Sequence, residues 1–147
     1  METYKNCKID YNKDTHTATC EIKHGSAVYI GKAYCHPDDT DMENEKTGVE
    51  IAYRRALIKS LRASKSEEKA IIAALKQTYY SMKHSKKFNE RSYENITLQR
   101  QIKLHEETLN ELNELIDDYT NHLKSYIDDK DKFYRRIRFN RNKAKNN

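Results

Sequence analysis

The sequence predicts an α+β fold: a small N-terminal antiparallel β-sheet packed on helices, followed by a long, coiled-coil-like C-terminal helix. In the first third, apolar and polar residues alternate in three short runs, which is the pattern of half-buried strands. From Gly48 onward the apolar residues recur every three or four positions, which is the period of an amphipathic helix. With 3 Gly and 1 Pro among 147 residues, few turns interrupt these helices, and the length is that of a single domain.

Residues 1–36 are expected to form a three-stranded meander. The turn signals are "NKD" at residues 12–14 and "HG" at residues 24–25. The residues expected to share a face on each successive strand are Cys7, Ile9 and Tyr11; Ala18, Cys20 and Ile22; and Val28, Ile30, Lys32 and Tyr34. Three strands of this kind leave an apolar face that needs a cover, and the following helices are the obvious cover.

Residues 37–47 are expected to form an acidic loop. Pro37 cannot donate a hydrogen bond to a strand neighbour, so the third strand should end near Cys35. Five acids and no base lie between Asp38 and Glu45 before the helical period begins. The sequence therefore predicts a solvated connection between sheet and helices.

Residues 48–91 are expected to form two helices. The apolar positions of the first are Val49, Ala52, Tyr53, Ala56, Leu57 and Leu61. Ser64 followed by Glu67 has the spacing of a capping box, which predicts the start of a second helix there. The apolar positions of that second helix are Ile71, Ala74, Leu75, Thr78, Tyr79 and Met82.

Residues 92–140 are expected to form one long helix, with a basic tail at residues 141–147. Its seam alternates spacings of four and three, as in a heptad repeat. The seam residues are Leu98, Ile102, His105, Leu109, Leu112, Ile116, Tyr119, Leu123, Tyr126, Lys130, Phe133 and Ile137. A short preceding helix would cover less than half of this seam, so the sequence predicts a homodimer or a larger assembly.

Charge is strongly segregated along the chain. Residues 49–91 and 132–147 each carry a net charge of +7, whereas residues 92–131 carry −6. The two basic zones favour a phosphate-bearing partner. No apolar run reaches the roughly 18 residues of a membrane span, and the N-terminus does not resemble a signal peptide, so we expect a soluble, intracellular protein with no membrane partner and with reduced cysteines.

The sequence contains no residue pattern that predicts a catalytic or metal site. His16, Cys20 and His24 are spaced along one strand, and four strand residues span about 13 Å, too far for neighbouring zinc ligands. The adjacent Cys35 and His36 would point to opposite faces of a strand, which is unsuited to a nucleophile and its base. No phosphate-binding loop, dinucleotide fingerprint or nucleophile elbow occurs. We therefore expect no enzyme, no metal and no cofactor.

The stretch from Gly31 to Arg62 carries a family resemblance. It contains the pattern Gly31-x-Ala33-x-Cys35-x-Pro37-x-Asp39, an acidic loop, Gly48 and "IAYRRALIKSLR". This resembles the N-terminal half of the Thoeris anti-defence family of phage sponge proteins, over residues 27–62 in motif and over the rest in layout.

The resemblance implies a specific function. Proteins of that family assemble from dimers into hexamers or larger oligomers in the host bacterial cytoplasm. They sequester, without cleaving, the cyclic ADP-ribose isomers made by immune TIR-domain enzymes, and some also hold cyclic oligonucleotides. Their pockets use aromatic stacking, an Asn and arginines near subunit contacts.

Side-chain chemistry suggests the ligand-binding residues, because aromatic and basic residues interleave between Tyr79 and Asn95. Aromatic rings stack on bases, amides read polar edges, and guanidinium groups bind phosphates. The expected stackers are Tyr79 and Phe88, the expected readers Asn89 and Asn95, and the expected phosphate clamps Arg54, Arg55, Arg91 and Arg100. The alternative is that Tyr79 and Phe88 belong to the core and that the lysines only solubilise a loop.

Two other functions stay open. The basic stretch at residues 132–147 contains no acid and would suit a coiled-coil, homodimeric nucleic-acid-binding protein. The same stretch would also suit the solubilising end of a long helix. A third possibility is a scaffold protein that binds neither class of ligand.

Overall fold

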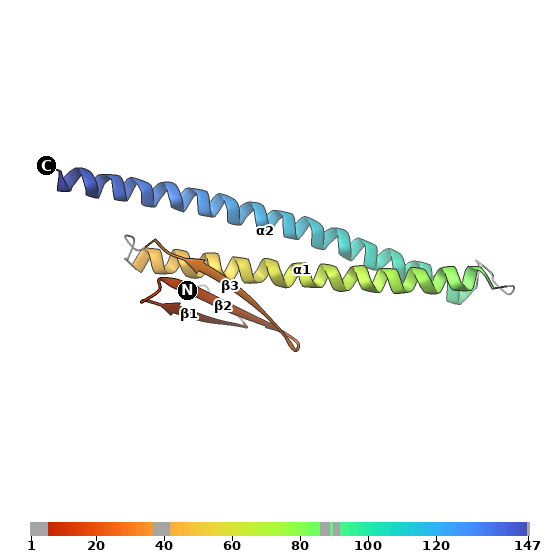
Figure 1. The fold of residues 1–147 in the computed structure, drawn as a ribbon. Coiled ribbons are helices and arrows are strands. Elements are labelled where there is room, and N and C mark those ends of the chain that lie inside the picture. The colour runs from red at the N-terminus through yellow and green to blue at the C-terminus, as the bar shows by residue number, and fades with distance from the viewer. Residues whose placement is uncertain (1–5, 37–41, 86–88, 90–91, 147) are drawn as a thin grey trace. The chain divides into compact units, whose positions relative to one another are not determined.

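The computed structural model describes residues 6–36, 42–85, 89 and 92–146, and it confirms the α+β class. The elements are β1 (Cys7–Asn12), β2 (Thr17–His24), β3 (Ala27–Tyr34), α1 (Met42–Lys83) and α2 (Tyr93–Lys145), as Figure 1 shows. They form two compact units. Unit 1 comprises Met1–Ser60 and Asp118–Asn147, and unit 2 comprises Leu61–Asp117. The expectation of a single domain stays a prediction.

The sheet is an antiparallel meander in the order β1-β2-β3, as the sequence predicts. The Asn12 side chain shapes the first turn, because its Oδ1 accepts hydrogen bonds from the backbone N–H groups of Asp14 and Thr15 at 2.9 and 3.1 Å. Gly25 in the second turn has a φ of 63°, a conformation that glycine adopts at no steric cost. The turn residues therefore fix the register of the strands.

The contact between the sheet and α1 is built from small residues. Ala18 and Cys20 of β2 are completely buried, and so are Ala52 and Ala56 of α1. Gly31 of β3 lies so close to α1 that a β-carbon there would overlap the Ala52 carbonyl oxygen and lie 2.5 Å from the Ala56 nitrogen. The helix backbone therefore rests almost directly on the strand.

This close contact decides which face of the third strand is buried. Val28, Ile30 and Tyr34 lie on the solvent face and are 47%, 38% and 77% exposed. Gly31 and Ala33 of the same strand face α1 instead. The sequence grouped these larger residues on one face without saying which face is buried, and the short distance to α1 admits only small residues at the contact.

Two basic residues of α1 close the outer edge of β3. The Arg55 Nη1 donates to the Lys32 carbonyl oxygen at 2.7 Å, and the Lys59 Nζ donates to the Ile30 carbonyl oxygen at 2.6 Å. Arg55 and Lys59 are one helical turn apart, which matches the two-residue spacing of these outward carbonyls along the strand. These bonds satisfy backbone groups that an edge strand otherwise leaves open.

Helix α1 is continuous from Met42 to Lys83, so the expected break at Ser64 is wrong, and so is the expected loop over residues 42–47. The rest of that expected loop, residues 37–41, lies outside the described residues. No Gly or Pro follows Gly48 within the helix, and the Ser66 hydroxyl bonds to the Arg62 carbonyl oxygen inside it. The capping-box pattern is overridden because residues 61–75 are mostly good helix formers. Helix α2 likewise extends to Lys145 and includes most of the expected tail.

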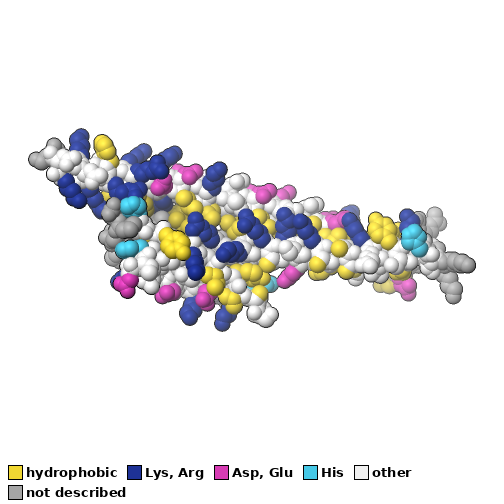
Figure 2. Space-filling model, in the orientation of Figure 1, with side chains coloured by type: hydrophobic (Ala, Val, Ile, Leu, Met, Phe, Trp, Pro, Cys, Tyr) yellow, Lys and Arg dark blue, Asp and Glu magenta, His cyan; other side chains and the backbone are white. Residues whose placement is uncertain are grey.

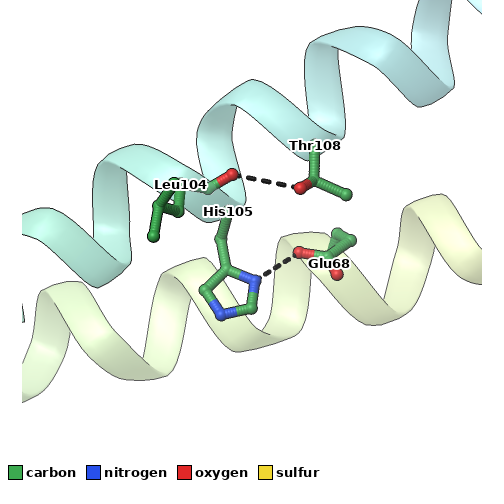
Figure 3. Close-up of polar contacts among 4 residues, drawn as sticks. All are labelled: Glu68, Leu104, His105 and Thr108. Carbon is green, nitrogen blue, oxygen red and sulfur yellow. Dashed lines mark hydrogen bonds and ion pairs between the residues drawn. The ribbon is translucent and has the colours of Figure 1, made fainter.

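In each unit, α1 packs against the seam of α2. In unit 1 the Thr47 and Tyr134 hydroxyls lie 3.2 Å apart. In unit 2 the His105 Nδ1 lies 2.7 Å from the Glu68 Oε2, a contact between the two helices that Figure 3 shows. The sequence argument for a dimer assumed a short covering helix, and that premise is wrong. The homodimer itself stays a prediction.

The buried stripe of α2 also departs from the heptad pattern near the C-terminus. Ile116 and Leu123 are buried as expected, but Tyr134 is buried at 6% exposure while the expected Phe133 is 46% exposed. A straight helix drifts by roughly 20° per heptad from a strict seven-residue repeat, so the buried face moves to the next residue. None of the described helices is long and apolar enough to cross a membrane.

Substituting Gly31 by Ala tests the close contact. We expect Gly31→Ala to lower the free energy of unfolding by about 2 kcal/mol or more, because backbone atoms on α1 cannot rotate away from the new methyl group. The matched control is Lys32→Ala, which alters the neighbouring exposed side chain and should change stability by less than about 0.5 kcal/mol. Urea unfolding measures both, and equal midpoints for the two variants would contradict this packing.

Stability at alkaline pH tests the burial of Cys20. Burial, and next the neighbouring Cys7, raise the pKa of Cys20 from 9.0 to about 12. The unfolded chain therefore loses this proton at lower pH than the folded chain. The contribution of Cys20 to the free energy of unfolding is complete below pH 9 and falls as the pH rises towards 12.

The measurement is urea unfolding between pH 8 and pH 10.5. Burial also raises the pKa values of Tyr11 and Tyr53, so the wild type carries several such contributions. Cys20→Ala should reduce the slope of unfolding free energy against pH by up to about 1.4 kcal/mol per pH unit. Identical slopes for wild type and variant would show that Cys20 titrates normally in the fold.

Candidate functional site

A pocket of about 200 Å³ lies within unit 1. Three segments line it: the end of β3 with the two residues that follow, the first turns of α1, and the C-terminal part of α2. The Cys35-His36 pair, expected only to end a strand, lies in its wall. The pocket thus joins segments that are about 100 residues apart in the sequence.

Local contacts hold the strand end against the start of α1. The Cys35 thiol donates to the Asn44 carbonyl oxygen with a sulfur-to-oxygen distance of 3.7 Å. Gly48 permits this approach, because a β-carbon there would lie 2.6 Å from the Cys35 sulfur. Burial, and next the neighbouring Cys35, raise the pKa of Tyr11, which packs close to Gly48.

One face of α2 supplies the Lys, Arg and Asp side chains of the lining. Lys130, Asp131, Tyr134 and Arg138 are spaced at i, i+1, i+4 and i+8 and all line the pocket. Tyr134 is fixed by its hydroxyl contact with Thr47, and both residues are buried. The side chains of this face therefore extend from a helix that is anchored to α1.

The charges of this face are unequal. Lys130 and Arg138 bring two positive charges to the lining, and Asp131 brings one negative charge. The Asp131 Oδ2 lies 3.0 Å from the Arg135 Nη2, so a further cation partly offsets that carboxylate. The Lys130 ammonium also lies 5.8 Å from the ring centroids of both Tyr126 and Phe133. The pocket is therefore electropositive and aromatic-flanked, which suits an anion.

Six of the residues expected to bind a ligand fall in the sequence range of unit 2, and the structure describes four of them. Tyr79 is half-buried, its hydroxyl accepts a hydrogen bond from the Gln99 Nε2 at 3.3 Å, and its ring meets that of Tyr80 edge to face. Arg100 is exposed on α2. Phe88 and Arg91 lie outside the described residues. The remaining two are Asn89 and Asn95.

Asn95 has a structural position. It is 2% exposed, and its Nδ2 donates to the Asn89 carbonyl oxygen at 2.5 Å. Its backbone N–H donates to the Ser92 Oγ at 3.3 Å, which is a helix cap at the start of α2. These contacts orient the Asn95 amide towards its own chain. Its expected role as a reader of a base stays a prediction.

Arg54 and Arg55 lie in unit 1 but are not among the residues that line the pocket. The Arg54 Nε donates to the Glu50 Oε1 at 2.7 Å, and its guanidinium carbon lies 4.9 Å from the Tyr126 ring centroid. Arg55 bonds to the Lys32 carbonyl oxygen of β3. Both arginines thus have partners within the fold. Their expected role as phosphate clamps stays a prediction. Arg54 and Arg55 belong to unit 1, whereas the other residues expected to bind the ligand belong to unit 2.

Sequence reasoning missed the residues that line the pocket. One signal was present, because Lys130 is a charged residue in an otherwise largely apolar seam. Tyr134 and Arg138 were hidden, since the strict heptad assigned burial to Phe133 and Ile137 instead. His36 lines the pocket only because the end of β3 lies close to α2, and no local sequence pattern reveals such a long-range contact.

Metal binding finds no support among the residues that the structure describes, because no three His, Cys, Asp or Glu side chains gather as ligands of one ion would. Comparison of the chain with models of protein families, with curated proteins and with solved structures finds no match. The site therefore has to be interpreted from its own chemistry.

Proposed function

We propose that the chain binds a small phosphate-bearing nucleotide in the unit 1 pocket and holds it without cleaving it. The observation that carries this proposal is the presence of Lys130 and Arg138 on one helix face inside a pocket of about 200 Å³. Ammonium and guanidinium groups make charge-assisted hydrogen bonds to phosphate oxygens. The Thr47 contact that anchors Tyr134 prearranges this face, which reduces the cost of binding.

The pocket dimensions indicate which part of a nucleotide it takes. Pockets for drug-sized ligands are typically about 300–1,000 Å³, so this pocket is of the size for a sugar phosphate rather than a whole dinucleotide. Tyr34 lies at the lining and is 77% exposed, which leaves a ring face for the base outside the pocket. A sequestering protein needs a Kd of about 1 μM, or about −8 kcal/mol.

The proposed ligand class comes from the resemblance of residues 27–62. On that basis the ligand is a cyclic ADP-ribose isomer made by TIR-domain enzymes, and the protein is a phage anti-defence sponge that acts in the host bacterial cytoplasm. A diphosphate-containing ring offers two phosphates to the cations of the pocket.

The proposed assembly is a homo-oligomer, and the charges of unit 2 support it. Its α1 part, residues 61–83, carries five Lys/Arg and two acids, while its α2 part, residues 93–117, carries two Lys/Arg and six acids. Part of this complementarity is used within one chain, where the Lys76 Nζ lies 2.9 Å from the Glu106 Oε1. The other charges of the two helices suit pairing between copies. Leu104 and Leu115, which are 62% and 40% exposed, offer apolar contacts for such a partner.

The decisive experiment compares two neighbouring lysines. Titration calorimetry with cyclic ADP-ribose isomers should show that Lys130→Met weakens binding at least tenfold, because one phosphate cation is lost while the aliphatic stem is kept. The control Lys132→Met changes an exposed lysine that does not line the pocket, and it should leave affinity unchanged. Sedimentation of the same samples measures the oligomeric state.

The ligand is then released by heating and analysed by mass spectrometry. Recovery of the intact cyclic nucleotide is the expected result. Recovery of a hydrolysed product would show an enzyme instead of a sponge. Equal affinities for Lys130→Met and Lys132→Met would show that the nucleotide, if it binds, does so outside this pocket.

Nucleic-acid binding is the second candidate, and one observation favours it. Lys and Arg side chains gather at the C-terminal end of α2, as Figure 2 shows, and no acid follows Asp131. Phe139 in this segment is 67% exposed, so it offers a ring for stacking on an unpaired base. This exposed end is the alternative binding surface.

Replacing Arg141, Lys143 and Lys145 by Gln separates the two candidates. These residues do not line the pocket, so nucleotide capture should be unchanged. If the chain binds DNA or RNA, the variant should weaken that binding in a gel shift and reduce the salt slope by up to about 0.9 per lost phosphate contact. Loss of nucleotide capture in this variant would contradict the pocket assignment.

A further inference from the structure

Asp131 is the one residue of the electropositive helix face that does not suit an anion. Its carboxylate lines the same pocket as Lys130 and Arg138, where it repels a phosphate. Its ion pair with Arg135 contributes little to the fold, because the side chains of Arg135 and Asp131 are 73% and 48% exposed. Neither fold stability nor phosphate binding accounts for this carboxylate.

We propose that Asp131 is a specificity-determining residue of the pocket: its carboxylate accepts a hydrogen bond from a sugar hydroxyl while Lys130 and Arg138 hold the phosphate. This inference rests on the proposed nucleotide-binding function. An ionised carboxylate is acceptor-only, and its two oxygens offer about four lone-pair sites, so Oδ2 can pair with Arg135 while Oδ1 accepts from a ligand. Ribose supplies such hydroxyl donors close to its phosphate.

Together, the two cations and the carboxylate define a class of ligands that is narrower than anions in general. A bare phosphate meets the two cations but also the repulsion of Asp131. A ribonucleotide meets the same cations and in addition donates to the carboxylate, and a bond to a charged group is stronger than one between neutral groups. The pocket should therefore prefer a ribonucleotide over a nucleotide without sugar hydroxyls.

The test uses three probes and isotope-labelled full-length protein in NMR titrations: AMP, 2′,3′-dideoxy-AMP and inorganic phosphate. The wild type should bind AMP about tenfold more tightly than the dideoxy analogue. In Asp131→Asn this preference should fall to about twofold or less. The same variant should bind inorganic phosphate more tightly than the wild type, because the repulsion is removed. A purely structural role would not produce this gain.

Two control variants isolate the role of the carboxylate. Arg135→Gln removes the ion pair but keeps the carboxylate, so the preference for AMP should persist. Asp128→Asn removes an exposed acid of α2 that does not line the pocket, so all three affinities should stay as in the wild type. Loss of the preference in Arg135→Gln would assign the effect to the ion pair and overturn the role of Asp131.

The outcomes distinguish the two proposals. If AMP and its dideoxy analogue bind the wild type equally, and Lys130→Met weakens both, then the pocket binds nucleotides and the role of Asp131 is overturned. If none of the three probes binds at millimolar concentration, then the nucleotide-binding function of this pocket fails, and the inference fails with it.

Discussion

The contact between α1 and β3 is the constraint on which the rest of unit 1 depends. Gly31 has no side chain, so the backbone of α1 approaches the strand to a distance that any larger residue would prevent. The surrounding positions are accordingly Ala18, Cys20, Ala52 and Ala56. Because the strand is held against the helix, its end lies beside the first turns of α1, where Gly48 admits the Cys35 thiol. The pocket wall is a consequence of this packing.

The fold class could be predicted from the sequence because periodicity is a local property. Alternation predicted β1, β2 and β3, and the 3.6-residue period predicted helices from Gly48 onward. The face of β3 could not be predicted by the same rule. Apolar size normally marks the buried face, but the spacing to α1 reverses this, so Val28 and Ile30 are exposed while Gly31 is buried. The helix break was mispredicted because Ser64 carries a capping signal that good helix formers on both sides override.

The site was harder to predict than the fold because its residues are not neighbours in the sequence. The expected ligand residues were chosen mainly from one segment in which aromatic, amide and basic residues interleave. The pocket instead combines His36 with Lys130 and Arg138, and only the packing of α2 on α1 brings these together. The buried face of α2 also differs from the predicted heptad seam, since the drift of a straight helix buries Tyr134 rather than Phe133. Long-range contacts of this kind leave only weak traces in a single sequence.

The helix dipole accounts for part of the basic C-terminus but not for the pocket cations. Cations near a helix C-terminus are favourable, so Lys143 and Lys145 in the last turn of α2 need no ligand to explain them. That effect falls off within about one turn, and Lys130 and Arg138 lie farther from the end. Lys130 instead lies over the rings of Tyr126 and Phe133, and both cations line the pocket. They line a pocket and are only partly exposed, so salt screens their charges less than those of the exposed helix end. This difference in screening is the physical ground for preferring a small nucleotide to a nucleic acid.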